Sequence, residues 1–203
     1  ATLKHFAGYA GTTGGRNRSP YPNGLRHLLD TEIPPFRHVI NTTHPASIMA
    51  AFNEIEGLPC HINQWMLQDV LRKRLGFEGL LVGDYQGLNR VRWYQKIGTS
   101  DADVGSMALK AGLQLELPNA FGYKHLQKLV QNGDVQEQDI DTAVRQMLSL
   151  KFRLGLFEAP MKLNGDKAEA LASSQETNSL AREAARQSIV LLKNENDFLP
   201  LQV

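Results

Sequence analysis

One carboxylate in this sequence stands where an enzyme could use it. Asp84 follows the short apolar run Leu80-Leu81-Val82 and a glycine, and Tyr85 comes next. A short apolar run bounded by glycines is typical of a fully buried strand. A carboxylate just past such a strand faces the mouth of whatever the strand helps to build, where it could act as a nucleophile or a metal ligand. An Asp after a glycine is also common in turns, and position alone favours that role.

Lys4 and His5 form a second unusual pair, inside an apolar stretch near the start of the chain. Adjacent side chains of a strand point to opposite faces, so both can meet a substrate only where the strand is ending. The alternative is a His bonded to a backbone carbonyl and a Lys whose stem covers apolar surface. Glu54 and Glu56 lie near a turn and are expected to face solvent, and Glu116 follows another apolar run.

Other reactive patterns are weak. The six histidines include no HExxH motif or short paired spacing, so no metal site is predicted. The loop Gly14–Arg18 could cradle a phosphate through backbone N–H groups and arginines, although it lacks the GK[ST] ending of a P-loop. Cys60 is the single cysteine, which excludes a disulfide framework, and a small buried residue is its expected role.

Composition excludes two classes of partner. The chain has 203 residues and a formal net charge of +1, with its Lys and Arg scattered rather than clustered, which gives no case for nucleic-acid binding. No apolar run approaches the ~20 residues that span a bilayer. The length suffices for one sizeable domain with a core.

The elements that must position these residues alternate between strands and helices. Strands are predicted over 1–10, 46–53, 79–83 and 113–117. Helices are predicted over 25–29, from 36 after a break at Pro34-Pro35, and over 63–75, 103–111, 121–132, 137–154 and 179–192. The last helix could turn into a strand at 189–192. Asn63 is a candidate N-cap. Apolar strands that alternate with helices indicate a parallel α/β sheet built from βα units.

The strand ends favour a barrel over an open sheet. In a (β/α)8 barrel the carboxyl ends of the strands face the active site, and polar groups recur at the predicted strand ends here. A doubly wound sheet stays open as an alternative, although no strand-GxGxxG-helix fingerprint is found. Four βα units make half a barrel and leave two unpaired sheet edges. The chain also starts without Met and inside a predicted strand. We therefore expect a segment of a longer protein.

Five blocks of the sequence resemble glycoside hydrolase family 3, in that family's order, from Lys4 to Leu201. They are KHFAGYAGTTGGRNRSP, IMAAFNEIEGLPCHINQWMLQDVLRKRLGFEGLLVGDY, ALKAGLQLELPN, DIDTAVRQMLSLKFRLGLF and LAREAARQSIVLLKNENDFLPL. The resemblance implies a (β/α)8-type barrel followed by an α/β sandwich domain. Residues 1–155 would be the second half of the barrel, 156–178 a linker, and 179–203 the start of the sandwich. The pattern is most similar to bacterial β-glucosidases and β-xylosidases.

The resemblance also implies roles for single residues. Asp84 matches the catalytic nucleophile. Lys4 and His5 match the pair that holds sugar hydroxyls in the −1 subsite. Met49 and Phe52 match pocket-lining positions, where Tyr is frequent in place of Phe52. Tyr85 matches the aromatic residue that stacks on the next sugar, often Trp, and Gly83 stands where Ser is usual.

The implied activity is cleavage of terminal non-reducing β-glucosides or β-xylosides with retention, through a glycosyl-Asp84 intermediate. Such an enzyme needs a second carboxyl, an acid, about 5–5.5 Å from the nucleophile. A nearby cation such as Lys4 would favour the ionised nucleophile. By resemblance the acid comes from beyond Val203 and further sugar-binding residues from before Ala1; Glu54 and Glu116 are not expected to serve.

Two other hypotheses stay open, a sugar-binding or inactive segment that does no chemistry and a phosphate-binding barrel that uses the Gly14–Arg18 loop. The expected partners are a β-linked oligosaccharide or glycoside together with the missing half-barrel and second domain, with no nucleic acid, membrane, metal or cofactor. The resemblance is compatible with a periplasmic or extracellular location and also with the cytoplasm.

Overall fold

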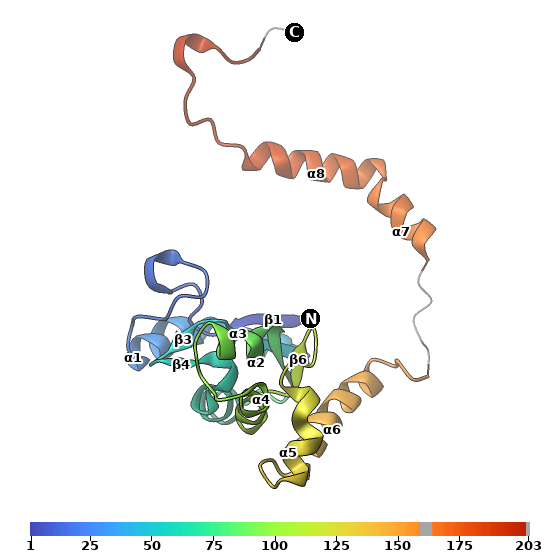
Figure 1. The fold of residues 1–203 in the computed structure, drawn as a ribbon. Coiled ribbons are helices and arrows are strands. Elements are labelled where there is room, and N and C mark those ends of the chain that lie inside the picture. Colours follow the sequence, from blue (N-terminus) through green and yellow to red (C-terminus); the bar gives the residue numbers. More distant parts are fainter. Residues whose placement is uncertain (159–163, 202–203) are drawn as a thin grey trace. The chain divides into compact units, whose positions relative to one another are not determined.

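The computed structural model describes residues 1–158 and 164–201. Contacts divide the chain into two compact units, Ala1–Glu158 and Ala159–Val203. Figure 1 shows the order of their helices and strands. The predicted domain boundaries at 155 and 178 remain predictions.

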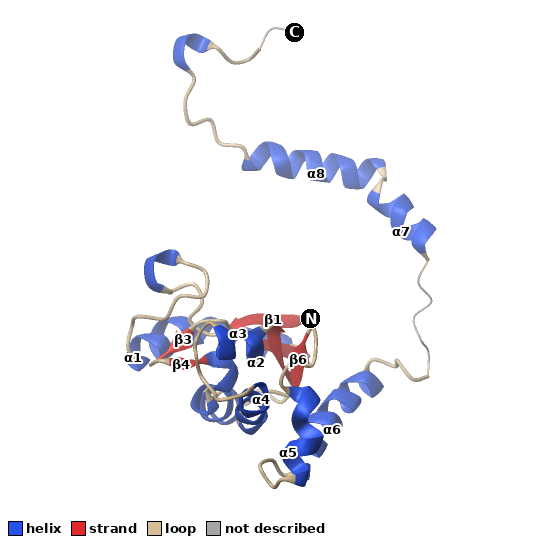
Figure 2. Ribbon diagram, viewed as in Figure 1, coloured by secondary structure: helices blue, strands red, loops and turns tan. Residues whose placement is uncertain are grey.

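A four-stranded parallel sheet organises the first unit, with the strand order β1-β2-β5-β6. Figure 2 shows the strands in red and the helices in blue. The strands are β1 (Thr2–Phe6), β2 (Ser47–Ala50), β5 (Leu80–Tyr85) and β6 (Leu115–Leu117). Ile48, in β2, pairs with Leu3 on one side and Leu81 on the other, and Ile48 and Leu81 are fully buried. Consecutive strands of the sheet are thus joined by helical crossovers, which confirms the predicted α/β class.

The strand bounds differ from the prediction at several ends. The strands predicted over 1–10, 46–53 and 113–117 are shorter. β1 stops before Gly8, whose positive φ of 75° no extended strand adopts. β5 is longer at its carboxyl end than predicted and includes Asp84 and Tyr85. Asp84 is therefore the penultimate residue of a strand rather than part of a turn.

The crossover from β1 to β2 is one continuous helical segment, made of α1 (Leu25–His27), a π-helical turn η2 (Leu28–Glu32) and α2 (Ile33–Thr43). The predicted break at Pro34-Pro35 is wrong, because both prolines lie in the first turn of α2. The change from π-type bonding in η2 to α-type bonding in α2 falls at these prolines, which have no N–H to continue the hydrogen bonds.

The crossover from β2 to β5 contains a small hairpin in a segment where neither a strand nor a helix was predicted. β3 (Glu54–Ile55) pairs with β4 (Leu58–Pro59), and a 3-10 turn, η3 (Cys60–Ile62), follows. The predicted helix is η4 (Trp65–Arg74), which has π-type hydrogen bonds. Asn63 caps it as predicted, because its Oδ1 accepts a 3.1 Å hydrogen bond from the N–H of Met66.

Beyond β5 the chain forms a helix where the sequence predicted a long loop. This helix is α3 (Gly87–Trp93), and its side chains Leu88 and Val91 are buried. α4 (Asp101–Lys110) is capped by Ser100, whose side chain accepts from the N–H of Asp103. After β6 come a 3-10 turn, η5 (Tyr123–His125), α5 (Leu126–Gln131) and α6 (Glu137–Arg153).

The second unit is helical within the residues that are described. It contains α7 (Gly165–Ala172), α8 (Gln175–Ser188) and a short turn, η6 (Glu195–Asp197). The predicted linker therefore includes a helix, and the predicted helix over 179–192 ends at 188. Residues 189–192 form no strand, since no described strand pairs with them, and Ile189 and Leu192 are 77% and 91% exposed.

Candidate active site

The carboxylate of Asp84 is held by contacts on both of its oxygens. Oδ1 accepts a 2.6 Å hydrogen bond from the N–H of Tyr85. Oδ2 lies 3.4 Å from Nε2 of His5, which is on β1, two strands away in the sheet. The side chains of Asp84 and His5 are 14% and 23% exposed. The carboxylate is therefore fixed in direction but still reaches the surface.

Five of the six residues predicted from sequence line one pocket of about 410 Å³ at the carboxyl ends of the strands. They are Lys4, Met49, Phe52, Asp84 and Tyr85. They come from β1, β2, the segment after β2, and β5. His5, the sixth, contacts Asp84. The fold thus brings together side chains that lie up to 81 positions apart in the sequence, while their roles remain predictions.

Lys4 and His5 both reach this region although β1 does not end at them. The strand continues to Phe6, and its pairing with β2 shifts register between Leu3 and Phe6. An irregularity of this kind changes the regular alternation of side chains between the two faces. The strand thus ends one residue past the pair, and the shifted register accounts for the access that both side chains have to the pocket.

The environment of His5 favours its neutral form. Partial burial lowers the pKa of His5, the carboxylate of Asp84 acts in the opposite direction, and the nearby charge of Lys4 lowers it further. A neutral imidazole keeps one N–H donor and one acceptor nitrogen. It can therefore bind a hydroxyl beside Asp84 without adding a second cation to Lys4.

A buried histidine that the sequence analysis assigned no role supports Asp84 from behind. Nε2 of His61 accepts a 3.0 Å hydrogen bond from the N–H of Asp84. Burial lowers the pKa of His61 to about 4, while the backbone of Ala51 acts in the opposite direction. His61 is thus a neutral acceptor that fixes the backbone of the carboxylate-bearing residue. It lies in GLPCHIN, which signalled only a turn.

Gly87 leaves the space that His61 occupies. A Cβ atom built on Gly87 would lie 2.1 Å from Nε2 of His61, whereas one built on Gly83 would meet nothing closer than 3.5 Å. The missing side chain at position 87 therefore matters for the site. At Gly83 there is room for the Cβ of the Ser that the resemblance leads one to expect.

The carboxylate of Glu116 binds backbone N–H groups of the loop after β6 and does not line the pocket that holds Asp84. Glu116 is 8% exposed, and its carboxylate accepts hydrogen bonds of 2.9–3.1 Å from the N–H groups of Gly122 and Tyr123. Burial raises the pKa of Glu116, while these N–H donors act against the shift. The carboxyl group holds the loop after β6, in agreement with the expectation that it is not the acid.

Three further predictions concern groups outside the pocket. Cys60 is fully buried, and burial raises the pKa of its thiol to about 12, so it is no thiolate nucleophile. Among the residues the structure describes, no three His, Cys, Asp or Glu side chains gather as metal ligands would. In the same residues, no helix has the length and apolar character needed to cross a bilayer.

The Gly14–Arg18 loop does not present a phosphate cradle. The N–H groups of Gly15 and Arg16 donate to the carbonyls of Thr12 and Thr13 at 3.0 and 3.2 Å, so they are not free for an anion. Arg18 instead reaches back over Phe52, with its guanidinium carbon 5.3 Å from the ring centroid. The structure therefore disfavours the phosphate-binding hypothesis.

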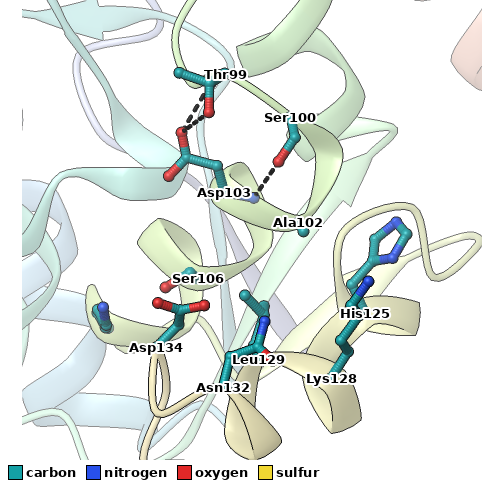
Figure 3. A pocket seen from close by; sticks show the side chains of 11 residues that line it. Thr99, Ser100, Ala102, Asp103, Ser106, His125, Lys128, Leu129, Asn132 and Asp134 are labelled. Carbon is teal, nitrogen blue, oxygen red and sulfur yellow. Dashed lines mark hydrogen bonds between the residues drawn. The ribbon is translucent and has the colours of Figure 1, made fainter.

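Another pocket, of about 490 Å³, lies between α4 and the α5 region (Figure 3). In its wall the carboxylate of Asp103 accepts from the N–H and the hydroxyl of Thr99, and the hydroxyl of Ser100 accepts from the N–H of Asp103. It contains none of the residues predicted from sequence. The pocket that holds Asp84 is therefore the candidate active site.

Comparison with known proteins gives a consistent family assignment. A family model described as "Glycosyl hydrolase family 3 N terminal domain" matches residues 1–150. The chain is 34% identical over 201 residues to a putative β-xylosidase of Formosa agariphila, covering 99% of this chain and 26% of that protein. It is 33% identical over 207 residues to a periplasmic β-glucosidase of Salmonella typhimurium, again covering 99% of this chain and 26% of that protein.

Solved structures agree in fold as well as sequence. A β-glucosidase from Erythrobacter marinus matches with a TM-score of 0.86 and 39% identity over 99% of this chain and 26% of that one. A β-glucosidase from Listeria innocua in complex with glucose matches with a TM-score of 0.83 and 30% identity over 98% of this chain and 27% of that one. The chain spans about a quarter of the length of the curated relatives it matches.

Proposed function

This chain belongs to glycosyl hydrolase family 3, and from that premise we propose that it forms part of the active site of a β-glycosidase. We further propose that a complementary half-barrel and a second domain accompany this chain, and the three together are called the full-length protein below. Its substrates would be terminal non-reducing β-glucosides or β-xylosides. The names of the relatives, β-glucosidase and β-xylosidase, support this choice.

The observation that carries the proposal is the pairing of Asp84 with His5 in a pocket that also contains Lys4. In the proposed reaction Asp84 attacks the anomeric carbon and forms a glycosyl ester, with departure of the aglycone oxygen. Water then hydrolyses the ester, so two inversions give net retention. His5 and Lys4 would bind sugar hydroxyls and stabilise the charge that develops in the transition state.

The chain supplies one carboxyl group to this chemistry. The acid that protonates the leaving oxygen would come from the second domain of the full-length protein, because Glu116 is already held by backbone N–H groups. We therefore expect little or no turnover from residues 1–203 alone.

The test is a trapping experiment with the full-length protein. A 2-deoxy-2-fluoro-β-glucoside with a good leaving group should leave a covalent sugar on Asp84, detectable by peptide mass spectrometry. Asp84→Ala should lower kcat on aryl β-glucosides and β-xylosides by about 10³-fold or more. Asp69→Ala removes an exposed carboxylate on η4 and serves as the control. Unchanged turnover in Asp84→Ala, or a label on another residue, would reject Asp84 as the nucleophile.

Absence of glycoside cleavage by the full-length protein would favour the sugar-binding alternative. Calorimetry with glucose and xylose then separates a binding protein from one that does neither.

A further inference from the structure

Two arginines from different parts of the chain stack on the same aromatic ring beside the candidate active site. The guanidinium carbon of Arg18, in the loop after β1, lies 5.3 Å from the ring centroid of Phe52. That of Arg90, on α3, lies 5.0 Å from the same centroid. Arg90 also lies 5.4 Å from the ring centroid of Tyr94. Cation–π contacts of this kind restrict long side chains that would otherwise be free.

The pocket carries more positive than negative charge. Lys4, Arg18 and Arg90 line it together with a single carboxylate, that of Asp84. Within residues 1–158 and 164–201, no ion pair involves any of these three cations. Asp84 has its own close contact with His5. A net positive charge therefore stays uncompensated at the mouth of the pocket.

Arg90 also has an unused donor. Its Nε is buried and finds no hydrogen-bond partner in the described part of the chain. Arg72 offers a contrast, because its guanidinium donates to two carbonyls and to Gln114. A buried charged donor without a partner costs free energy unless a ligand or another group satisfies it. Because Nε itself is enclosed, the donors of Arg90 that a ligand could reach are its terminal amino groups, which likewise make no hydrogen bond with the described residues.

We propose that Arg18 and Arg90 select β-glycosides that carry a carboxylate, so that the full-length protein prefers acidic over neutral substrates. This inference rests on the proposed function. Each guanidinium lies over the Phe52 ring, and its terminal amino groups can match the two oxygens of a carboxylate in a two-point contact. Because stacking has already restricted both side chains, less conformational entropy is lost on binding. The carboxylate could belong to the aglycone or to the sugar.

Two pairs of substrates distinguish these sources. The first compares 4-carboxyphenyl β-glucoside with its neutral 4-carbamoylphenyl isostere. The second compares a β-glucuronide with the β-glucoside of the same aglycone. In each pair the ratio of kcat/KM for the acidic over the neutral substrate is measured in wild-type protein, Arg18→Gln and Arg90→Gln. Intrinsic differences in leaving-group reactivity cancel when the ratio is compared between proteins.

For one of the two substrate pairs, the ratio of kcat/KM should fall about tenfold or more in Arg18→Gln and in Arg90→Gln. The reason is that a hydrogen bond between a guanidinium and a carboxylate is stronger than one between neutral groups. Arg90→Lys keeps the charge and should retain part of the preference. Arg26→Gln removes an exposed arginine on α1 and should leave the ratio unchanged. The affected pair identifies where the carboxylate lies.

The inference is overturned if neutral glycosides are cleaved but the ratio is the same in wild type and both variants for both pairs. That result would mean that carboxylates of the missing half-barrel neutralise the two arginines. Failure to cleave any glycoside would overturn the proposed function as well, so the two failures are distinguishable. Arg18 lies on an exposed loop, so Arg18→Gln should fold. If Arg90→Gln does not fold, the ratio measured for Arg18→Gln tests the inference.

Discussion

The backbone N–H of Asp84 donates a 3.0 Å hydrogen bond to Nε2 of His61, a fully enclosed imidazole that lies 23 positions earlier in the sequence. This bond ties the end of β5 to the turn η3. It fixes the peptide plane from which the Asp84 carboxylate projects, while Tyr85 and His5 fix the carboxylate itself. His61 is thus a positioning residue for Asp84.

Replacement of His61 should impair turnover without touching the substrate. In His61→Ala the N–H of Asp84 loses its acceptor, which costs about 1–3 kcal/mol of stability if the group stays buried. A small displacement of the carboxylate should also lower kcat by about 10–100-fold. His61→Gln offers a carbonyl acceptor and should recover part of kcat. Steady-state kinetics of the full-length protein measure kcat of the two variants. Equal kcat in wild type and His61→Ala would contradict the assigned role.

His61 also predicts how stability depends on pH. Burial lowers its pKa from 6.5 to about 4, so between these values the unfolded chain binds a proton that the native protein excludes. The stabilisation present above pH 6.5 should therefore be lost as the pH falls toward 4, by up to about 3 kcal/mol. Urea unfolding of wild type and His61→Gln over this range isolates the contribution. Identical pH dependence in the two proteins would argue that His61 does not titrate this way.

Replacement of two glycines of the same region by alanine should affect stability to very different extents. In Gly87→Ala the new Cβ would lie 2.1 Å from Nε2 of His61, so the ring or helix α3 must move. We expect a loss of about 1–3 kcal/mol together with a lower kcat. In Gly83→Ala the nearest atoms would be 3.5 Å away, and stability should change little. Thermal unfolding compares them, and equal shifts in the two variants would contradict the close approach at Gly87.

Sequence patterns predicted the parts of the fold that rest on local periodicity. Apolar runs located the strands around Ile48 and Leu81, since these residues are buried by the sheet itself. The helix α3 was missed because QGLNRVRWY mixes charged and aromatic residues, and only Leu88 and Val91 reach the core. The run at 189–192 has strand composition, but strands form only where a partner strand exists.

The site was predictable to the extent that it follows strand ends. Asp84, Lys4 and Phe52 share one pocket, as the strand-end rule and the family resemblance led us to expect. His61 and Arg90 were not predictable, because both act through contacts across 23 and 38 positions of the sequence. Arg18 was considered as part of a possible phosphate-binding loop, and nothing in its neighbours signals that the loop returns to Phe52.

Glu116→Gln tests whether the buried carboxyl after β6 is structural. A glutamine retains one acceptor oxygen for the N–H groups of Gly122 and Tyr123, which Glu116 binds at 2.9–3.1 Å. We expect a stability loss of about 1–2 kcal/mol and kcat within about threefold of wild type, since no role in proton transfer is assigned to it. A loss of turnover at unchanged KM and unchanged folding would instead identify Glu116 as a participant in the reaction.

Arg72 and Lys73, adjacent on η4, should differ sharply in what they contribute to stability. The structure buries Arg72 in part, and its guanidinium donates to the carbonyls of Phe77 and Gly79 at 2.8 and 2.6 Å. It also donates to Oε1 of Gln114, the same atom that accepts from the N–H of Leu81. Arg72 thereby connects the end of η4 to the start of β5.

Removal of Arg72 leaves these acceptors without a partner, so Arg72→Ala should cost about 2–4 kcal/mol. Burial lowers the pKa of Arg72 to about 10, so the side chain stays charged at neutral pH. Arg72→Lys should recover only part of the lost stability, because an ammonium lacks the planar guanidinium that reaches three acceptors. Lys73 pairs with Asp69 at 2.7 Å on the exposed face, so Lys73→Ala should stay within about 0.5 kcal/mol of wild type. Chemical unfolding of the three variants measures the order Arg72→Ala, Arg72→Lys, Lys73→Ala. If Lys73→Ala were as damaging as Arg72→Ala, charge on the helix rather than the link from η4 to β5 would be the stabilising feature.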